Sequence, residues 1–349
     1  MGGDAVQRDV HLRDLSADDR VQLMIQVAKR YYHLDMTLNV IAKDLGLTRW
    51  QASRLLTDAR ESGIVRIEIV PPTPRLPDLE SRLQRVFGLR DAVVVPFDPD
   101  RSDDLMLDSV AQAAGRLLAG LDRFPLIGVS WGRTMSAVAR RLPPFWNEGV
   151  EVVLLNGAMN VRASATRTNN VAELFARSAN GHATLLPVPA ILGKAATRIA
   201  LEQDPTIASV LELGRKAQVI CFGLGAMGTD SVLVQSGFVT EAEAADLKAR
   251  GAVGDILSRY IDAEGAVVDA GLNDRTIGAD LASCKERAFS IGVGTGRTKH
   301  AVTLACLRAG YINVLVTDEQ TALFLLEAAH IGFHVNRTPP ANSRLVEPR

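Results

Sequence analysis

Three glycine-rich segments carry the residues best suited to chemistry. The first, Gly128-Val129-Ser130-Trp131-Gly132, follows an apolar run and precedes a helical pattern. Its spacing matches G-x-S-x-G, the turn that presents a nucleophilic serine in α/β-hydrolases. The same context also makes a phosphate cradle, because glycines let backbone N–H groups face an anion at a helix N-terminus. In that interpretation the hydroxyls of Ser130 and Thr134 add hydrogen bonds.

A serine hydrolase also needs an acid and then a histidine further along the chain. Asp269 followed by His300 or His330 meets that order, but a chain with six histidines offers such a match easily by chance. No His-Gly-Gly oxyanion motif precedes Ser130. We therefore favour binding of an anion or a sugar at this segment, and we predict no catalytic residue.

The second segment, Gly223-Leu224-Gly225-Ala226-Met227-Gly228, matches the dinucleotide motif G-x-G-x-x-G. That motif needs a helix that leads to a strand ending in an acidic residue about 20 positions on, and the sequence after Gly228 lacks this arrangement. Close approach of the backbone to a different ligand explains the glycines equally well. We predict no cofactor.

The third segment, Gly292 to Lys299, lacks the Gly-Lys-Ser/Thr ending of a nucleotide-binding P-loop. A glycine turn with Lys299 at a helix start suits a single phosphate, and a solvated lysine in a first helical turn is the alternative. Asp255 lies between the apolar positions Gly254 and Ile256. A carboxylate only accepts hydrogen bonds, so Asp255 suits sugar hydroxyls, whereas Lys299 suits a phosphate. Helix capping by Asp255 is the alternative.

The N-terminal part of the chain predicts DNA recognition. Ser16 caps a first helix, Gly46 ends a short second helix, and Thr48 caps a third, which is the helix-turn-helix plan. Residues 64–69 alternate like a strand and predict a wing. Off the apolar stripe, the third helix carries side chains that can read bases or hold phosphates, although Trp50 is equally suited to packing. The predicted DNA-binding residues are Thr48, Arg49, Trp50, Gln51, Ser53 and Arg54.

The elements that position these residues form two domains. Four prolines within residues 71–77 predict a linker between a DNA-binding domain at 1–70 and an effector-binding domain at 78–349. In the second domain, apolar runs alternate with helical patterns, which indicates an α/β fold with a parallel sheet covered on both faces. We expect strands at 92–95, 126–129, 150–155, 184–186, 218–222, 266–268, 290–293 and 314–316.

Composition narrows the class further. The 349 residues carry 39 basic and 40 acidic side chains, which excludes a histone-like polycation. Three cysteines without C-x-x-C spacing indicate neither a metal site nor a disulfide framework, so a reducing cytoplasm fits best. The first 30 residues hold no signal-peptide pattern, and no apolar stretch is long enough to span a membrane.

Together these segments resemble the SorC/DeoR-type sugar-responsive transcriptional regulators over residues 15–329. The likeness depends on the order and spacing of stretches that are individually weak. They are Ala52-Ser53-Arg54-Leu55-Leu56 with Gly63-Ile64-Val65, Gly128 to Thr134, Gly223-Leu224-Gly225, Gly254-Asp255-Ile256, and Ile312 to Glu319. The resemblance implies a winged-helix-like helix-turn-helix domain and a Rossmann-like effector domain of the sugar-phosphate isomerase type. It also implies homodimers or homotetramers on operator DNA, with a phosphorylated sugar or polyol as effector.

The resemblance implies ligand contacts from Ser130, Thr134, Gly225, Asp255 and Lys299. The predicted effector site further includes Gly132, Arg133, Asn156, Gly157 and Gly223. The family usually has Gly-Gly-x-x-Lys where this chain has Thr295-Gly296-Arg297-Thr298-Lys299, and Thr-Gln where it has Thr37-Leu38. An unphosphorylated polyol therefore stays open as the ligand. We predict a regulator, with a serine hydrolase or a sugar-phosphate enzyme carrying a DNA-binding domain as alternatives.

Overall fold

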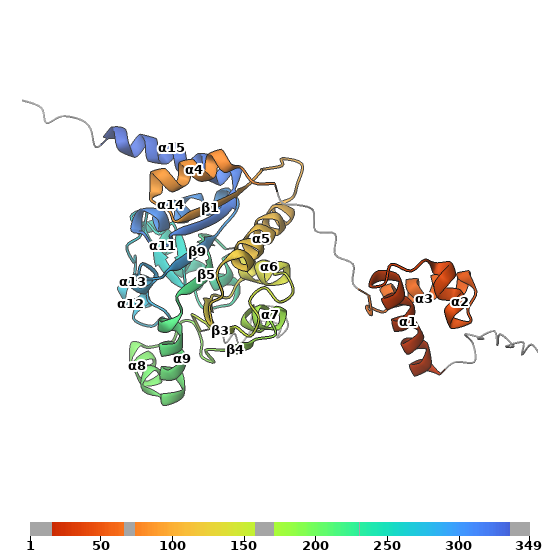
Figure 1. Ribbon diagram of the computed structural model, residues 1–349. Coiled ribbons are helices and arrows are strands. Elements are labelled where there is room, and N and C mark those ends of the chain that lie inside the picture. Colours follow the sequence, from red (N-terminus) through yellow and green to blue (C-terminus); the bar gives the residue numbers. More distant parts are fainter. Residues whose placement is uncertain (1–15, 66–73, 158–170, 230, 336–349) are drawn as a thin grey trace, which may run out of the picture. The chain divides into compact units, whose positions relative to one another are not determined.

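The chain forms two compact units, Met1–Pro72 and Thr73–Arg349 (Figure 1). The computed structural model describes residues 16–65, 74–157, 171–229 and 231–335. Helix α4 (Pro77–Phe87) begins inside the predicted linker 71–77, since Pro77 is its first residue. The fixed φ of proline suits this first helical position, where no backbone N–H is needed.

The N-terminal unit contains the three predicted helices, α1 (Ala17–Tyr32), α2 (Leu38–Leu45) and α3 (Arg49–Glu61). Ser16 Oγ accepts a hydrogen bond from the Asp19 backbone N–H, and Gly46 adopts a left-handed φ of 64° in the turn between α2 and α3. Of the predicted wing, Ile64 and Val65 form a bend, and the remainder lies outside the described residues. Apolar residues of all three helices, with Leu47 of the turn between α2 and α3, form one buried core: Met24, Val27, Ala28, Ile41, Ala42, Leu47, Ala52, Leu55, Leu56 and Ala59.

The second unit is built on a seven-stranded parallel sheet, which confirms the predicted α/β fold. The strands lie side by side in the order β1-β10-β9-β5-β2-β3-β4. Their bounds, in that order, are Asp91–Val95, Val314–Asp318, Phe289–Val293, Val219–Gly223, Leu126–Val129, Glu151–Leu154 and His182–Thr184. Strand β4 therefore starts two residues before the predicted run 184–186.

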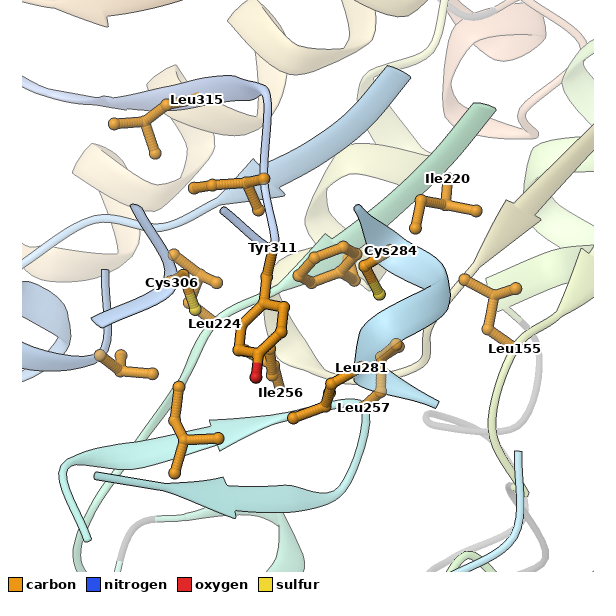
Figure 2. Close-up of a cluster of buried hydrophobic side chains, with 14 of the residues drawn as sticks. Leu155, Ile220, Leu224, Ile256, Leu257, Leu281, Cys284, Cys306, Tyr311 and Leu315 are labelled. Carbon is orange, nitrogen blue, oxygen red and sulfur yellow. The ribbon is translucent and has the colours of Figure 1, made fainter. Parts of the chain in front are cut away.

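Helices cover both faces of this sheet. Alternate strand residues point to opposite sides, so that Val94 belongs to one apolar cluster and Val93 to the other. Helices α4, α9 (Pro205–Lys216), α14 (His300–Ala309) and α15 (Glu319–Val335) contribute to the first cluster, part of which Figure 2 shows. Helices α5 (Asp103–Gly120), α6 (Arg133–Arg141) and α7 (Val171–Ser178) pack on the second.

A small antiparallel sheet was not predicted. It contains β6 (Gly225–Ala226), β7 (Gly254–Ile256) and β8 (Arg259–Ile261). Strands of two or three residues are too short to give an alternation pattern, and long-range pairing creates them. The predicted strand 266–268 is wrong, because only Val267 pairs, in an isolated bridge with Ile261 beside this sheet.

The remaining short elements are α8 (Ala195–Gln203), α10 (Val232–Gln235), α11 (Glu241–Ala249), α12 (Ala270–Asn273), α13 (Leu281–Cys284) and the 3-10 turn η1 (Arg297–Lys299). Within the described ranges, none of the helices is both long enough and apolar enough to cross a membrane.

Candidate functional site

The topology of the parallel sheet creates a crevice between β2 and β5. Within this sheet, the strand that follows β2 in the sequence is β3, on one side of it, whereas the strand that follows β5 is β9, on the other side. Ligands of open α/β sheets bind outside the carboxyl ends of the strands at such a switch point. Ser130 follows β2 and Leu224 follows β5, so two of the glycine-rich segments meet at this edge.

A cavity of about 370 Å³ opens at the crevice. Nine of the ten predicted effector residues line it, namely Ser130, Gly132, Arg133, Thr134, Asn156, Gly223, Gly225, Asp255 and Lys299. The lining that was not predicted comes from Asp103, Trp131, Met135, Leu224, Ala226, Met227, Gly228, Thr229, Ser231, Val232, Leu233, Leu257, Ser258 and Thr298.

Gly157 does not line the cavity. Its carbonyl oxygen accepts a hydrogen bond of 2.8 Å from Trp131 Nε1. A Cβ at position 157 would lie 2.5 Å from the Val188 carbonyl oxygen, so only glycine fits there. Gly157 therefore orients the lining residue Trp131 from behind.

The segment after β2 turns directly into the N-terminus of α6. Gly132 is the N-cap residue with a φ of 129°, a conformation that favours glycine. The first turn of α6 therefore faces the cavity with its unpaired backbone N–H groups and their partial positive charge. The Ser130 hydroxyl is buried and accepts a hydrogen bond of 3.4 Å from the Gly223 N–H, which links the two glycine segments.

Lys299 reaches this turn from the opposite segment of the chain. It ends η1 and is the N-cap residue of α14, and its Nζ donates a hydrogen bond of 2.8 Å to Thr134 Oγ1. The loop before it is anchored by the buried carboxylate of Asp318, which accepts hydrogen bonds from Thr295 Oγ1 and the Gly296 N–H. Burial lowers the pKa of Lys299 to about 8, and the charge of Arg133 contributes to this shift.

Asp255 faces the same cavity from the small antiparallel sheet. It lies within β7 and pairs with Gly225 of β6, so the helix-capping alternative is wrong. Any Cβ at position 225 would collide with Asp255 Oδ1, which explains why glycine is needed there. Burial raises the pKa of Asp255 to about 7, while a hydrogen bond from the Ser258 backbone and the charge of Lys299 oppose this shift.

The residues proposed for a hydrolytic triad do not meet Ser130. Asp269 caps α12 through the Leu272 N–H and forms an ion pair of 2.6 Å with Arg250. His300 stacks on Phe324, with 4.5 Å between the ring centroids. Neither of them lines the cavity, and no histidine is found among its lining residues within the described part of the chain.

Helix α3 presents the predicted DNA-binding residues. Arg49, Trp50, Ser53 and Arg54 are exposed, as is the N-cap residue Thr48. The packing alternative for Trp50 is wrong, because 66% of the residue is exposed and it takes no part in the core of the unit. The guanidinium of Arg54 lies over the Trp50 ring, 5.6 Å from its centroid, which is a cation–π distance.

Comparisons with known proteins find relatives that cover most of both units. Residues 72–327 match the model of the "Putative sugar-binding domain" family. The deoxyribonucleoside regulator of Bacillus subtilis is 33% identical over 308 residues, which cover 88% of this chain and 98% of the relative. The sorbitol operon regulator of Klebsiella pneumoniae is 31% identical over 316 residues, 88% of this chain and 99% of the relative. The crystal structure of full-length SorC from Klebsiella pneumoniae superposes with a TM-score of 0.67 at 30% identity, covering 89% of this chain and all of that one.

This chain belongs to the SorC/DeoR-type family of sugar-binding transcriptional regulators. The resemblance inferred from short sequence stretches is thus confirmed. The relatives just named are regulators.

Within this regulator, one predicted DNA contact is engaged elsewhere. Thr48 Oγ1 accepts a hydrogen bond from the Gln51 N–H, and the Thr48 N–H donates one of 2.7 Å to Gln51 Oε1. This reciprocal capping box occupies the carbonyl oxygen that a bidentate contact to adenine would use. The Thr-x-x-Gln spacing is visible in the sequence, so the capping role of Gln51 was predictable.

The turn between β7 and β8 contributes cavity residues that no sequence signal revealed. Leu257 and Ser258 both adopt left-handed φ values, 49° and 68°, although neither is glycine. Asn156 Nδ2 donates a hydrogen bond of 3.0 Å to Ser258 Oγ, while Asn156 Oδ1 is buried without a partner in the described structure. Strained residues of this kind are frequent where a structure positions a ligand.

Proposed function

We propose that this regulator binds operator DNA through the start of α3, and that a small phosphorylated sugar or polyol in the cavity changes its affinity for that DNA. The observation that carries the proposal is the shared cavity of Lys299, the α6 N-terminus and Asp255. It combines an anion-binding end with an acceptor for hydroxyl groups.

The phosphate would occupy the end formed by α6 and Lys299. The unpaired N–H groups of the first turn of α6 suit phosphate oxygens, and Lys299 and Arg133 supply positive charge. Lys299 is already directed at this turn through its hydrogen bond to Thr134. Binding of a phosphate also stabilises the charged form of this half-buried lysine.

The hydroxyl groups would contact Asp255 and Asn156. The Asp255 carboxylate accepts hydrogen bonds from hydroxyls, and the unpartnered Asn156 Oδ1 offers a further acceptor. Trp131 and Leu257 supply apolar surface for the carbon skeleton. The relatives are named for deoxyribonucleosides and sorbitol, which supports a ligand of the sugar or polyol class.

Regulation requires the ligand to bind the DNA-competent and DNA-incompetent states with different affinity. Such coupling typically amounts to about 1 to 3 kcal/mol, or roughly 5- to 150-fold in affinity. We propose that the regulator acts in the cytoplasm as a homodimer or homotetramer, because helix-turn-helix units usually bind repeated half-sites in pairs.

The proposal is tested by titrating the full chain with DNA from upstream of its own gene, with and without a panel of sugar phosphates and the matching unphosphorylated compounds. We expect at least one phosphorylated compound to shift DNA affinity by about fivefold or more. The same compound at 100 times its Kd should stabilise the chain by about 2.7 kcal/mol in thermal unfolding. Failure of every compound to change either quantity would reject the proposal.

We also propose that Ser130 is a binding residue without catalytic turnover. A serine-directed fluorophosphonate should leave Ser130 unlabelled, because its buried hydroxyl bonds to Gly223 and has no histidine beside it within the described cavity lining. Stoichiometric labelling of Ser130 would support the hydrolase alternative instead.

A further inference from the structure

A second cavity lies in the α/β unit and shares no lining residue with the first. Its volume is about 200 Å³, and it lies among the end of β3, the helices α8 and α9, and the start of β8. It has both apolar and charged lining. The residues are Leu154, Leu155, Arg198, Glu202, Val210, Leu211, Gly214, Arg215, Arg259, Gly278, Ala279 and Asp280.

Arg259 is the most unusual residue in this cavity, because a charged side chain is only 7% exposed there. Its guanidinium donates hydrogen bonds to three neutral oxygens, at 3.0 Å to Asn273 Oδ1, 3.1 Å to the Leu257 carbonyl and 3.5 Å to the Gly278 carbonyl. No carboxylate of the described residues lies within 4.0 Å of it. Buried charges are normally paired, but the carboxylates of Asp280 and Glu202 act on Arg259 without forming an ion pair with it, and burial lowers its pKa.

The two acids in the lining are engaged with other groups. Both carboxylate oxygens of Glu202 accept hydrogen bonds from Arg198 Nη1, at 2.9 and 2.8 Å. Asp280 Oδ1 accepts one of 2.8 Å from the Ser283 N–H and so caps α13. The lining therefore contains three arginines against two carboxylates, and Arg259 is the one without an ion pair among the described residues.

We propose that this second cavity binds a small anion, a carboxylate or a phosphate, with Arg259 as its principal partner. The planar guanidinium offers paired N–H groups that match two oxygens of either anion. The apolar wall of Leu154, Leu155 and Val210 would accommodate a short carbon chain attached to the anionic group.

The position of Arg259 connects this site with the effector cavity. Its Nη1 holds the carbonyl of Leu257, and the Leu257 residue lines the effector cavity. Leu257 also belongs to the same buried apolar cluster as Leu155 of the second cavity, and both are labelled in Figure 2. An anion that binds the Arg259 guanidinium would therefore change its hydrogen bond to the Leu257 carbonyl in the β7–β8 turn. Binding at either cavity would then alter the affinity of the other.

The test uses the full chain with inorganic phosphate or succinate as the probe, followed by calorimetry and thermal unfolding. A Lys299→Ala background is used because we expect it to weaken phosphate binding in the effector cavity. In that background we expect saturable binding of at least one probe, and a tenfold or greater loss of it on Arg259→Gln. Arg308→Gln, on an exposed arginine outside both cavities, is the matched control and should bind the probe normally.

A second variant separates the anion site from the structural support that Arg259 gives to the turn. A Cβ at Gly214 would lie 3.7 Å from Leu155 Cδ2, an ordinary contact, so Gly214→Met fills the cavity without removing any charge. It should also reduce probe binding at least tenfold while circular dichroism stays unchanged. Probe binding that is absent in the Lys299→Ala background, or that survives in Gly214→Met, would overturn the proposal. Neither result bears on the effector, which is tested separately by sugar phosphates and DNA.

Discussion

The proposed DNA-recognition face and the proposed effector cavity of this regulator are built in different ways. The exposed residues Arg49, Trp50, Ser53 and Arg54 come from one turn and a half of α3, and water surrounds most of them. The cavity residues come from segments as far apart as Ser130 and Lys299, and most of them are partly or fully buried, although Arg133 and Asp103 are exposed. Surface positions on a helix can be changed nearly independently, whereas the cavity residues depend on one another.

This dependence is visible around Asp255. Its carboxylate occupies the space that the missing Cβ of Gly225 leaves, and its charge and that of Lys299 shift each other's pKa. Lys299 in turn donates a hydrogen bond to Thr134. Substitutions within such a group are not expected to be additive, because neighbouring residues share partners.

The largest expected effect concerns pH and Asp255. Burial raises its pKa in the folded state to about 7, above the ordinary value of 3.8, so the folded state keeps the proton to a higher pH than the unfolded state does. The stabilisation from protonated Asp255 is present below pH 4 and is lost as the pH rises to 7, with a slope of at most about 1.4 kcal/mol per pH unit. The Asn side chain in Asp255→Asn cannot ionise, so this variant does not lose that stabilisation. Its free energy of unfolding in urea, relative to that of the wild type, should therefore increase as the pH rises from 4 to 7.

The exposed residue Asp122 provides the control for this measurement. Asp122→Asn should follow the wild-type pH profile, since that side chain is not in the cavity. If Asp255→Asn and the wild type show parallel pH profiles, burial in the cavity does not affect the Asp255 carboxylate. The cavity residues would then be as independent of one another as the exposed residues of α3.

The next effect concerns Lys299 and the phosphate. A charge-assisted hydrogen bond is typically worth about 1.5 to 3 kcal/mol, so Lys299→Ala should weaken a phosphorylated effector about tenfold or more. The matching unphosphorylated compound should lose much less. Isothermal titration measures both, with the exposed Lys248→Ala as control. Equal losses for the two ligands would remove Lys299 from the phosphate site.

Arg49→Ala tests the exposed face of α3. Loss of a base or phosphate contact should weaken operator binding by about 1 to 3 kcal/mol at fixed salt. Unfolding free energy and sugar-phosphate affinity should stay at wild-type values, because Arg49 is exposed on α3. Gel-shift titration measures operator affinity, and the control is Arg82→Ala, which removes an exposed arginine of the second unit. Unchanged operator affinity would exclude Arg49 from the interface.

The smallest expected effect separates capping from base contact at Gln51. Gln51→Ala removes one half of the capping box and should lower the unfolding free energy of the DNA-binding unit by about 1 kcal/mol. Gln51→Glu keeps an acceptor for the Thr48 N–H and should restore stability. Denaturant unfolding of both variants measures this difference. If Gln51→Ala is as stable as the wild type and yet binds operator poorly, Gln51 reads DNA and the capping contact is incidental.

Features that depend on neighbouring residues were predictable from the sequence alone. Ser16 and Thr48 as helix caps, Gly46 in its turn and the apolar runs of the parallel strands all follow from local backbone and burial preferences. The segments at Ser130, Gly223 and Lys299 were also recognisable, because a glycine-rich turn directly after an apolar strand is a local pattern. Parallel strands then bring their carboxyl ends to one edge, which explains why these segments meet.

Other features arise only when distant segments come together in the fold. Strand β7 exists because it pairs with β6 and β8, and the left-handed residues Leu257 and Ser258 connect it to β8 without a glycine to signal the turn. Among the described residues Arg259 forms no ion pair, and this too depends on which distant segments surround it. Long-range pairing and burial set these features, and neither the spacing nor the type of adjacent residues encodes them, since each depends on which distant segments come to lie beside it.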